Sequence, residues 1–350
     1  MAVMVRNLLY DLKVFKSVEF EIPVISVGNI TVGGTGKTPH IEYLVNLLKN
    51  HYRVATLSRG YKRKTIGFRI VETGSSVREC GDEPLQLKNR FQEITVAVCE
   101  NRVTGVKELL RSTNPPDLVL LDDAFQHRRI TPDINILLVD YSRHVKNDHL
   151  LPAGSLREGI GQLRRANMVI VTKCPGQLTP ISRKIFKKDL HIRPYQELYF
   201  TRLVYGPLCP VFRNDFQLPD VASLKESGVL LVTGIASPAK ISDFLAPLSG
   251  EMSAVAFPDH HYFKISDIQL IATKFAGLKM SRKIIVTTEK DAIRFRDLPD
   301  LPRDIKDNLY YLPVTIRFAE NEESNFDQRI INYVRKNKGN RELYQRKNKK

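Results

Sequence analysis

Residues Val24–Pro39 read VISVGNITVGGTGKTP, and they contain the clearest structural signal in the chain. Val24–Val27 is a short apolar run typical of a buried strand, and a helix is expected to begin near Lys37. The glycines between these elements allow the backbone N–H groups to turn toward phosphate oxygens. The start of the helix adds free N–H donors and a favourable dipole. Strand, loop and helix together predict a phosphate-binding loop for a nucleotide.

The loop itself supplies the expected contacts to ATP, which are Thr31, Val32, Gly33, Gly34, Thr35, Gly36, Lys37 and Thr38. The ammonium of Lys37 would reach the β- and γ-phosphates, and the hydroxyl of Thr38 would bind Mg²⁺. Thr31 departs from the usual pattern G-x-x-x-x-G-K-[ST], which has glycine at this place. A glycine-rich turn without a nucleotide is the alternative, and the flanking strand and helix argue against it.

Further apolar runs repeat the strand pattern at Val54–Leu57, Thr95–Val98, Leu118–Leu121, Ile134–Val139 and Met168–Val171. They are short and apolar on both faces, as parallel strands covered by helices are. Their alternation with amphipathic stretches predicts an α/β fold, a doubly wound parallel sheet like that of P-loop NTPases. Right-handed crossovers then bring the C-terminal ends of the strands to one edge of the sheet.

The pattern breaks near residues 200–225, where prolines gather, and resumes afterwards with new strand-like runs. We therefore expect a second, smaller α/β domain. The expected division is a P-loop core with an N-terminal amphipathic helix over residues 1–197, a linker over 198–224 with 310–318 as a possible partner strand, the second domain over 225–335, and a basic tail over 336–350.

A pair of acidic residues, Asp122 and Asp123, directly follows the apolar run Leu118–Leu121. Carboxylates at the tip of a strand beside the phosphate loop can hold Mg²⁺ directly or through water. Gln126 follows closely and could contact the nucleotide or position a water molecule. A pair of strand-end acids without a metal is the alternative, and the neighbouring phosphate loop argues against it.

Three classes of P-loop protein fit these features to different degrees. A GTPase needs [NT]-K-x-D to read guanine, and Thr172–Pro175 (TKCP) has proline in place of the aspartate. An ATPase that drives assembly or transport at the membrane surface is the main alternative, since Gln126 could position water. A kinase needs a base near the acceptor hydroxyl. Gly81–Pro84 (GDEP) and Asp259–His261 (DHH) could supply one, although each could instead be structural.

The formal net charge of +16 is concentrated toward the end of the chain, where residues 335–350 hold eight Lys or Arg and one Glu. A solvated tail is the simplest interpretation, and attraction to anionic lipid headgroups is the alternative. No recognition motif favours nucleic acid. The four cysteines form no C-x-x-C pair, which argues against a zinc site and fits a reducing cytoplasm.

The N-terminal residues predict an amphipathic helix, because one helical face holds the apolar residues Val5, Leu8, Leu9, Leu12 and Phe15. Such a helix could pack on its own domain or lie in a membrane surface. No stretch approaches the roughly 20 consecutive apolar residues that a membrane-spanning helix needs.

Seven stretches, in this order along most of the chain, resemble one family. They are Val24–Pro39, Ser58–Tyr61 (SRGY), Gly81–Pro84 (GDEP), Asp122–Arg128 (DDAFQHR), Leu151–Glu158 (LPAGSLRE), Phe257–Phe263 (FPDHHYF) and Thr287–Arg294 (TTEKDAIR). The chain resembles the tetraacyldisaccharide 4′-kinases of Gram-negative bacteria. It departs from them at Ala124 and at Lys62, where the family usually has glycine.

The resemblance implies an activity and a place of action. The γ-phosphate of ATP would pass, with Mg²⁺, to the 4′-hydroxyl of an acylated glucosamine disaccharide 1-phosphate, which gives the 4′-phosphorylated lipid IVA in lipid A biosynthesis. The protein would be cytoplasmic and peripheral at the cytoplasmic face of the bacterial inner membrane. It would not bind nucleic acid, and a monomer is the default expectation.

The resemblance also implies roles for individual residues. Asp82 and His260 would form a catalytic dyad. The expected metal ligands are Thr38, Asp122, Asp123 and Glu158. Gln126 would join the phosphate loop in binding ATP, and the acceptor would contact Tyr61, Arg102 and Arg157.

Overall fold

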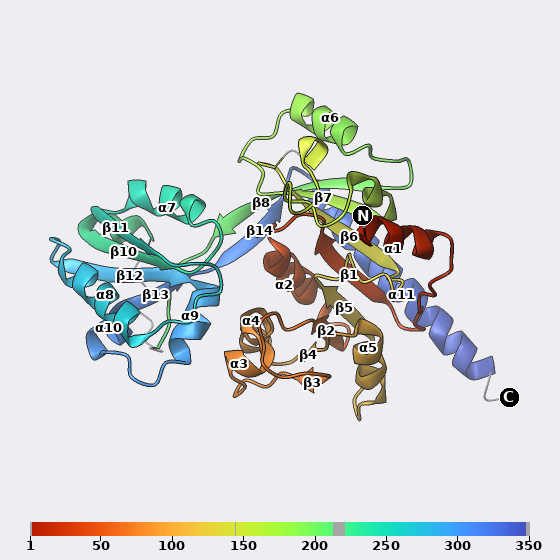
Figure 1. Cartoon of the computed structure of the whole chain (residues 1–350), viewed down its shortest axis with the longest axis horizontal. Helices are drawn as coiled ribbons and strands as arrows, with labels where there is room; N and C mark the ends of the chain where they lie inside the picture. Colours follow the sequence, from red (N-terminus) through yellow and green to blue (C-terminus); the bar gives the residue numbers. More distant parts are fainter. Residues whose placement is uncertain (1, 144, 213–220, 348–350) are drawn as a thin grey trace. The chain divides into compact units, whose positions relative to one another are not determined.

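The computed structural model describes residues 2–143, 145–212 and 221–347, which belong to two compact units (Figure 1). The first unit comprises residues 1–204 with 315–350, and the second comprises residues 205–314. The chain therefore leaves the first unit once and returns to it. Each unit has its own sheet and its own buried core.

The first unit is built on a nine-stranded sheet in the order β14-β8-β7-β6-β1-β5-β2-β4-β3. The strands are β1 (Val24–Asn29), β2 (Val54–Ser58), β3 (Arg69–Ile70), β4 (Thr95–Val98), β5 (Leu118–Asp122), β6 (Ile134–Asp140), β7 (Met168–Thr172), β8 (Glu197–Tyr205) and β14 (Val314–Phe318). The strands from β1 to β8 pair in parallel, apart from the short antiparallel β3. The predicted doubly wound parallel sheet is thus confirmed, with β1 at its centre.

Seven α-helices belong to this unit within the described residues: α1 (Ala2–Asp11), α2 (Lys37–Leu48), α3 (Val77–Cys80), α4 (Asp82–Arg90), α5 (Arg102–Arg111), α6 (Pro180–Asp189) and α11 (Glu322–Lys347). Val106 and Leu109 of α5 pack in a core cluster with Leu57 and Val119 of the sheet. The winding direction reverses between α2 and α5, so right-handed crossovers place these two helices on opposite faces.

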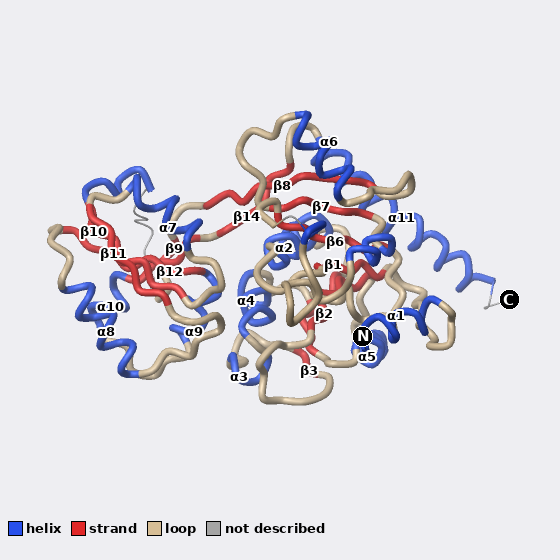
Figure 2. The backbone as a smooth tube through the Cα atoms, turned by 45° about the horizontal axis from the view of Figure 1, so that its top comes forward, coloured by secondary structure: helices blue, strands red, loops and turns tan. Residues whose placement is uncertain are grey.

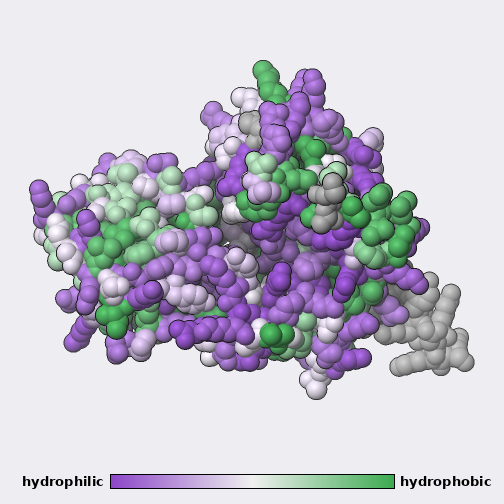
Figure 3. Space-filling view, in the orientation of Figure 1, coloured by the Kyte–Doolittle hydropathy of each residue, from purple (hydrophilic) through white to green (hydrophobic). Residues whose placement is uncertain are grey.

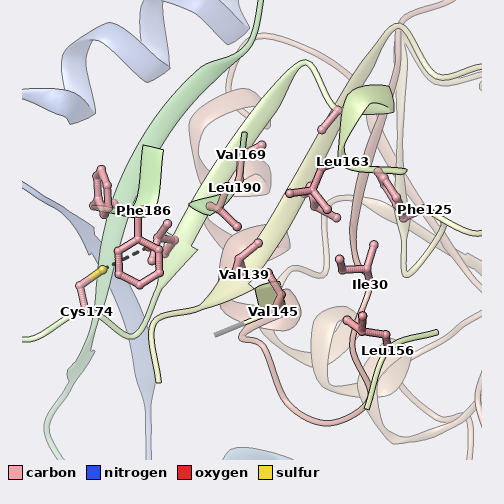
Figure 4. Packing of buried hydrophobic residues seen from close by; sticks show 14 residues of the cluster. Ile30, Phe125, Val139, Val145, Leu156, Leu163, Val169, Cys174, Phe186 and Leu190 are labelled. Atoms are coloured by element: carbon pink, nitrogen blue, oxygen red, sulfur yellow. Dashed lines mark hydrogen bonds between the residues drawn. The ribbon is translucent and has the colours of Figure 1, made fainter. Parts of the chain in front are cut away.

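A second cluster fills the space between the sheet and α6 (Figure 4). Phe186 of α6 packs with Val139 of β6 and Val169 of β7, while Leu156 and Ile30 extend the cluster toward the phosphate loop. The start of the phosphate loop therefore packs on the same apolar core that holds the strands together.

The second unit has a five-stranded sheet in the order β11-β10-β12-β13-β9. Its elements are β9 (Cys209–Pro210), β10 (Ser227–Thr233), α7 (Ala239–Leu245), β11 (Glu251–Ala256), α8 (Ile265–Ala276), β12 (Arg282–Thr288), α9 (Glu289–Arg296), α10 (Arg303–Asn308) and β13 (Leu309–Leu312). The strands are parallel except β9, and the chain winds to both sides of β10. Their C-terminal ends therefore meet at one edge near β10 and β12.

The two units differ from the expected domain boundaries in three places. Residues 198–205 are not a linker but part of β8, which pairs with β7 and buries Tyr199 and Phe200. Of the possible partner strand 310–318, only the part after Pro313 lies beside β8, as β14, while the part before it joins the second sheet as β13 (Figure 2). Residues 213–220 of the expected linker lie outside the described residues.

Helix α11 is the third difference, because it belongs to the first unit rather than to the second domain expected over residues 225–335. Its apolar residues Phe326, Ile330 and Val334 are buried, and the hydroxyl of Tyr43 on α2 donates to Asp327 at 2.7 Å. The expected basic tail continues this helix as far as Lys347.

Helix α1 carries its apolar residues on the outside. Met4, Val5 and Leu8 are more than half exposed, whereas Asn7 is buried, and Figure 3 shows apolar side chains gathered over this helix. Among the described residues, none of the helices has the length and hydropathy needed to cross a bilayer. The amphipathic helix is thus present, with its polar side against the protein.

Gly28 in β1 leaves no room for a side chain, since an added Cβ would lie 2.7 Å from Cβ and 2.8 Å from the backbone nitrogen of Phe125. We expect Gly28→Ala to lower the free energy of unfolding by about 1–3 kcal/mol through overpacking. Gly74→Ala, at a position with nothing within 4 Å, is the control and should change it by less than about 0.5 kcal/mol. Urea unfolding of both variants measures the difference, and equal stabilities would contradict the packing argument.

Candidate functional site

The phosphate loop between β1 and α2 is stabilised on one side by the segment around Ser155. The backbone N–H of Val32 donates to the carbonyl of Ser155 at 2.8 Å, and that of Arg157 donates to the carbonyl of Ile30 at 2.6 Å. Gly33 and Gly36 have φ values of 92° and 87°, in the left-handed region that favours glycine. The LPAGSLRE stretch therefore holds the start of the loop, which explains why the two motifs occur together.

Side chains that sequence analysis did not assign to the site hold the loop on its other side. The His40 ring lies 2.7 Å from the carbonyl of Gly36 and 3.1 Å from the hydroxyl of Thr201, and burial lowers its pKa to about 4. The ammonium of Lys173 donates to the carbonyl of Gly34 and pairs with Asp140 at 2.7 Å. Lys173, in the TKCP stretch examined for guanine recognition, thus supports the phosphate loop.

Two further hydrogen bonds fix Thr35 at the centre of the loop. Its hydroxyl accepts from the amide of Asn29 at 2.9 Å, and its carbonyl accepts from the hydroxyl of Thr172 at 2.9 Å. The amide of Gln126 donates to the carbonyl of Asn29 at 2.7 Å. Gln126 is thereby placed next to the end of β1, immediately before the loop.

The acidic pair at the tip of β5 lies beside Lys37 in the structure. The carboxylate of Asp123 is 3.5 Å from the Lys37 ammonium and 3.0 Å from the Arg157 guanidinium. Burial opposes ionisation of Asp123, but Lys37 and then Arg157 outweigh it and lower the pKa of this carboxyl. Asp123 is therefore a charged carboxylate between two cations.

The pKa of Asp122 is shifted in the opposite direction. Burial, together with the charges of Glu83 and Asp123, raises the pKa of Asp122 from 3.8 to about 7. Its Oδ1 atom is buried and has no hydrogen-bond partner within the described part of the chain. A buried carboxylate oxygen without a donor fits a cation ligand, so the residues present are compatible with a bound Mg²⁺.

The GDEP turn lies next to these groups. Gly81 has a φ of 91°, and α4 begins directly after it with Asp82, which is buried and accepts from the backbone N–H of Glu83 at 2.9 Å. Thr38, Glu83 and Asp122 line one small cavity. The structure thus brings together the phosphate loop, the acid pair and the GDEP turn within the first unit.

Two expected site residues, Arg102 and Glu158, make buried structural contacts. The guanidinium of Arg102 is only 2% exposed, and it donates to the carbonyls of Cys99 at 2.8 Å and Asp122 at 3.2 Å. Arg102 also lines a groove with Asn101 and His127, so its binding of the substrate stays a prediction. Its physical role is to hold the end of β5 from behind.

Glu158 is the second of these residues; it was expected to bind a metal, and that role also stays a prediction. Its carboxylate is fully buried, with one oxygen accepting from Arg6 at 2.7 Å and Asn7 at 3.0 Å, and the other from Arg165. No group of three metal-binding side chains occurs among the residues that the structure describes. Glu158 therefore anchors α1, and its oxygens are already occupied by donors.

The exposed face of the site carries the remaining expected residues. Tyr61 is 58% exposed, and the ammonium of Lys62 lies 5.9 Å from the centre of its ring. Lys62 has a φ of 59°, which explains why glycine is usual there. Ala124 is absent from the residues with positive φ, so the methyl group in place of glycine causes no backbone strain.

His260 belongs to the second unit and lies in the loop after β11. It has a φ of 60°, and its ring is 3.8 Å from the carboxylate of Asp259. His261 is bonded instead to Asp267 at 2.8 Å and stacks on Phe257. Of the two neighbouring histidines, His261 is thus engaged in holding its own loop.

Asp122 should be a source of instability above neutral pH. Because the folded state binds its proton more tightly than the unfolded chain does, stability falls as pH rises from 3.8 to about 7. We expect Asp122→Asn to raise the free energy of unfolding at pH values above that range by roughly 4 kcal/mol. The gain should shrink as the pH is lowered toward the ordinary range of the carboxyl.

Urea unfolding of the nucleotide-free protein at two pH values measures this effect. Asp300→Asn, on an exposed position, is the matched control and should change stability little at either pH. A loss of stability in Asp122→Asn under mildly alkaline conditions would contradict the burial argument.

Glu158→Gln should loosen α1. Removing one charge from a buried network leaves Arg6 and Arg165 without their counter-ion, and we expect a loss of about 3 kcal/mol. Glu108→Gln, in an exposed pair with Arg111, should lose less than about 1 kcal/mol. Limited proteolysis between α1 and β1, combined with urea unfolding, measures both effects. Equal losses in the two variants would show that Glu158 is not an anchor.

Known proteins resemble this chain over nearly its whole length. The family model described as tetraacyldisaccharide-1-P 4′-kinase matches residues 1–335. A tetraacyldisaccharide 4′-kinase of Phocaeicola vulgatus is 47% identical, covering 97% of this chain and 93% of the relative. One from Bacteroides thetaiotaomicron is 46% identical, covering 99% and 93%.

A solved structure is also similar. LpxK from Aquifex aeolicus in complex with ATP matches with a TM-score of 0.72 and 31% sequence identity, covering 95% of each chain. The similarity confirms the predicted fold class, and the family match confirms the resemblance seen in the sequence motifs. This chain belongs to the tetraacyldisaccharide-1-phosphate 4′-kinase family.

Proposed function

We propose that this protein is a tetraacyldisaccharide 4′-kinase of lipid A biosynthesis, which transfers the γ-phosphate of ATP to the 4′-hydroxyl of a tetraacyldisaccharide 1-phosphate. The observation that carries the proposal is the close placement of Thr38, Glu83 and Asp122, which line one small cavity and so bring acidic groups next to the phosphate loop. The names of the relatives agree with this activity.

The nucleotide would be held by the phosphate loop, with the Lys37 ammonium at the β- and γ-phosphates. Mg²⁺ would be held by Thr38, Asp122 and Asp123. When bound, it would neutralise part of the negative charge that phosphoryl transfer moves. Gln126, fixed to the carbonyl of Asn29, would contact the nucleotide from the end of β1.

Asp82 would accept the proton of the acceptor hydroxyl, with His260 as its partner. A carboxylate can accept the proton of a sugar hydroxyl as that oxygen attacks phosphorus. Asp82 is buried at the start of α4, next to Glu83 of the same cavity. A buried base is protected from water, which favours transfer to the acceptor over hydrolysis of ATP.

The acceptor would approach from the side of α1. A groove of about 520 Å³ there is lined by apolar and basic side chains, among them Arg6, Phe15, Gln126 and Arg128. Acyl chains suit apolar walls, and a sugar phosphate suits arginine. Arg157 and the exposed Tyr61 would also contact the acceptor.

The exposed apolar face of α1 fits peripheral contact with a membrane. Its side chains can enter the headgroup boundary while the net charge of +16 attracts anionic lipids. We place the protein in the cytoplasm, at the cytoplasmic face of the inner membrane, where a lipid-borne acceptor would be reached.

One assay tests the proposal: labelled [γ-³²P]ATP with and without tetraacyldisaccharide 1-phosphate. We expect label in the lipid, and Asp82→Asn should lower kcat at least about 100-fold with little change in ATP affinity, because a base acts in the transition state. Lys37→Ala should weaken ATP binding and turnover together. Asp300→Asn is the matched control. Rapid phosphate release without lipid, and no labelled lipid, would instead support an ATPase that drives assembly or transport.

A further inference from the structure

One motif has no role in the site described so far, the TTEKDAIR stretch Thr287–Arg294 in the second unit. It covers the end of β12 and the start of α9. The strand beside it is β10, with Val232 paired to Thr287, and Gly234 directly follows β10. The motif thus lies at the C-terminal edge of the second sheet, on the strands where ligand sites form in open α/β sheets.

Asp291 is the buried centre of this motif. Its side chain is fully buried, and its carboxylate accepts from three donors: the backbone N–H of Gly234 at 2.9 Å, the hydroxyl of Thr288 at 2.7 Å and the guanidinium of Arg294 at 2.6 Å. These bonds tie the first turn of α9 to the loop after β10. A carboxylate held by three donors fixes the groups around it.

Arg294 extends the arrangement to His260. One guanidinium nitrogen, Nη1, donates to Asp291 and, at 3.1 Å, to the carbonyl of Gly234. The other, Nη2, faces Nδ1 of His260 at 3.4 Å. Arg294 is only 4% exposed, so its planar fork has little freedom to move.

Gly234 shows how closely these groups pack. An added Cβ at this position would lie 3.0 Å from Asp291 Oδ1 and 3.3 Å from Arg294 Nη1. The carbonyl of the same glycine also accepts from the backbone N–H of His260 at 3.2 Å. The backbone of His260 is therefore held by Gly234, and its ring faces Arg294.

The groups that face the His260 ring limit which of its two nitrogens can carry the proton. Arginine and lysine only donate, and a neutral imidazole has one acceptor nitrogen. Lys290 Nζ faces Nε2 of His260 at 3.3 Å, so Lys290 and Arg294 compete for the single lone pair. Arg294 is fixed by a buried ion pair, whereas Lys290 lies on a partly exposed, flexible stem.

We propose that Arg294, held by Asp291, is a positioning residue that keeps Nδ1 of His260 as a hydrogen-bond acceptor and the ring proton on Nε2. The inference rests on the proposed function, in which His260 is the partner of Asp82. With its proton on Nε2, the imidazole donates a hydrogen bond to a carboxylate or phosphate oxygen. Asp82 then acts as the base, and His260 orients the group that accepts its hydrogen bond.

The first test reads the tautomer in the intact wild-type enzyme. ¹⁵N NMR of the full chain, labelled at histidine and measured at mildly alkaline pH, distinguishes protonated from unprotonated ring nitrogens. His260→Gln identifies the signals. We expect an unprotonated Nδ1 and a protonated Nε2, and a protonated Nδ1 would overturn the proposal without any activity measurement.

The second test is Arg294→Lys. Lysine keeps the charge beside Asp291 but offers one nitrogen, so it cannot bond to Asp291, Gly234 and His260 together. We expect kcat to fall at least about tenfold, while the Kd for ATP stays within about twofold, and the two tautomers of His260 to mix. Arg303→Lys, on a side chain that is 93% exposed, is the matched control and should leave kcat and the NMR signals unchanged.

The outcomes separate the inference from the function on which it rests. A wild-type protein that does not phosphorylate the disaccharide would refute the proposed function, while the ring signals would still be readable. An active enzyme whose Arg294→Lys variant keeps kcat and the wild-type tautomer would refute the positioning role alone. Thermal unfolding shows whether that variant folds, and if it does not, the wild-type tautomer decides.

Discussion

The ion pairs of Asp123 with Lys37 and Arg157 are the interaction on which the site depends. They connect three segments that are far apart in sequence: the start of α2, the tip of β5 and the segment before Glu158. Burial alone would favour the neutral carboxyl, and the charges of Lys37 and Arg157 keep the pKa of Asp123 below its ordinary value. Its neighbour Asp122 has no comparable partner for Oδ1, so two adjacent carboxyls differ in protonation and in role.

The same segment links the site to α1. Arg157 contacts Asp123, and the next residue, Glu158, holds Arg6 and Asn7 of the helix. Helix α1 is therefore attached through its polar side, and its apolar residues are left exposed. The two interpretations of the N-terminal helix are thus compatible, since it packs on its domain through buried charges and still presents an apolar face to a membrane surface.

Sequence reasoning predicted those features that depend on local chain properties. The glycines between β1 and α2, the apolar runs and the acids after β5 each have a local physical cause, and the structure has them where they were expected. The place of α11 depends instead on Phe326, Ile330 and Val334 finding a surface on the first unit, which no local pattern specifies. The split at Pro313 likewise depends on which sheet offers a neighbouring strand.

The roles of individual site residues were harder to predict than the site itself. A sequence motif singles out Arg102 and Glu158, but whether an ionic side chain faces a ligand or a buried partner depends on three-dimensional surroundings. Both side chains turn inward, where backbone carbonyls or arginines satisfy them. His40 and Lys173 show the converse, because neither lies in a recognisable catalytic motif and both form hydrogen bonds with the phosphate loop. The buried polar groups around a site therefore fix its geometry as much as the residues that would touch the substrate. In the second unit, Asp291 and Arg294 fix the position of His260 in this way.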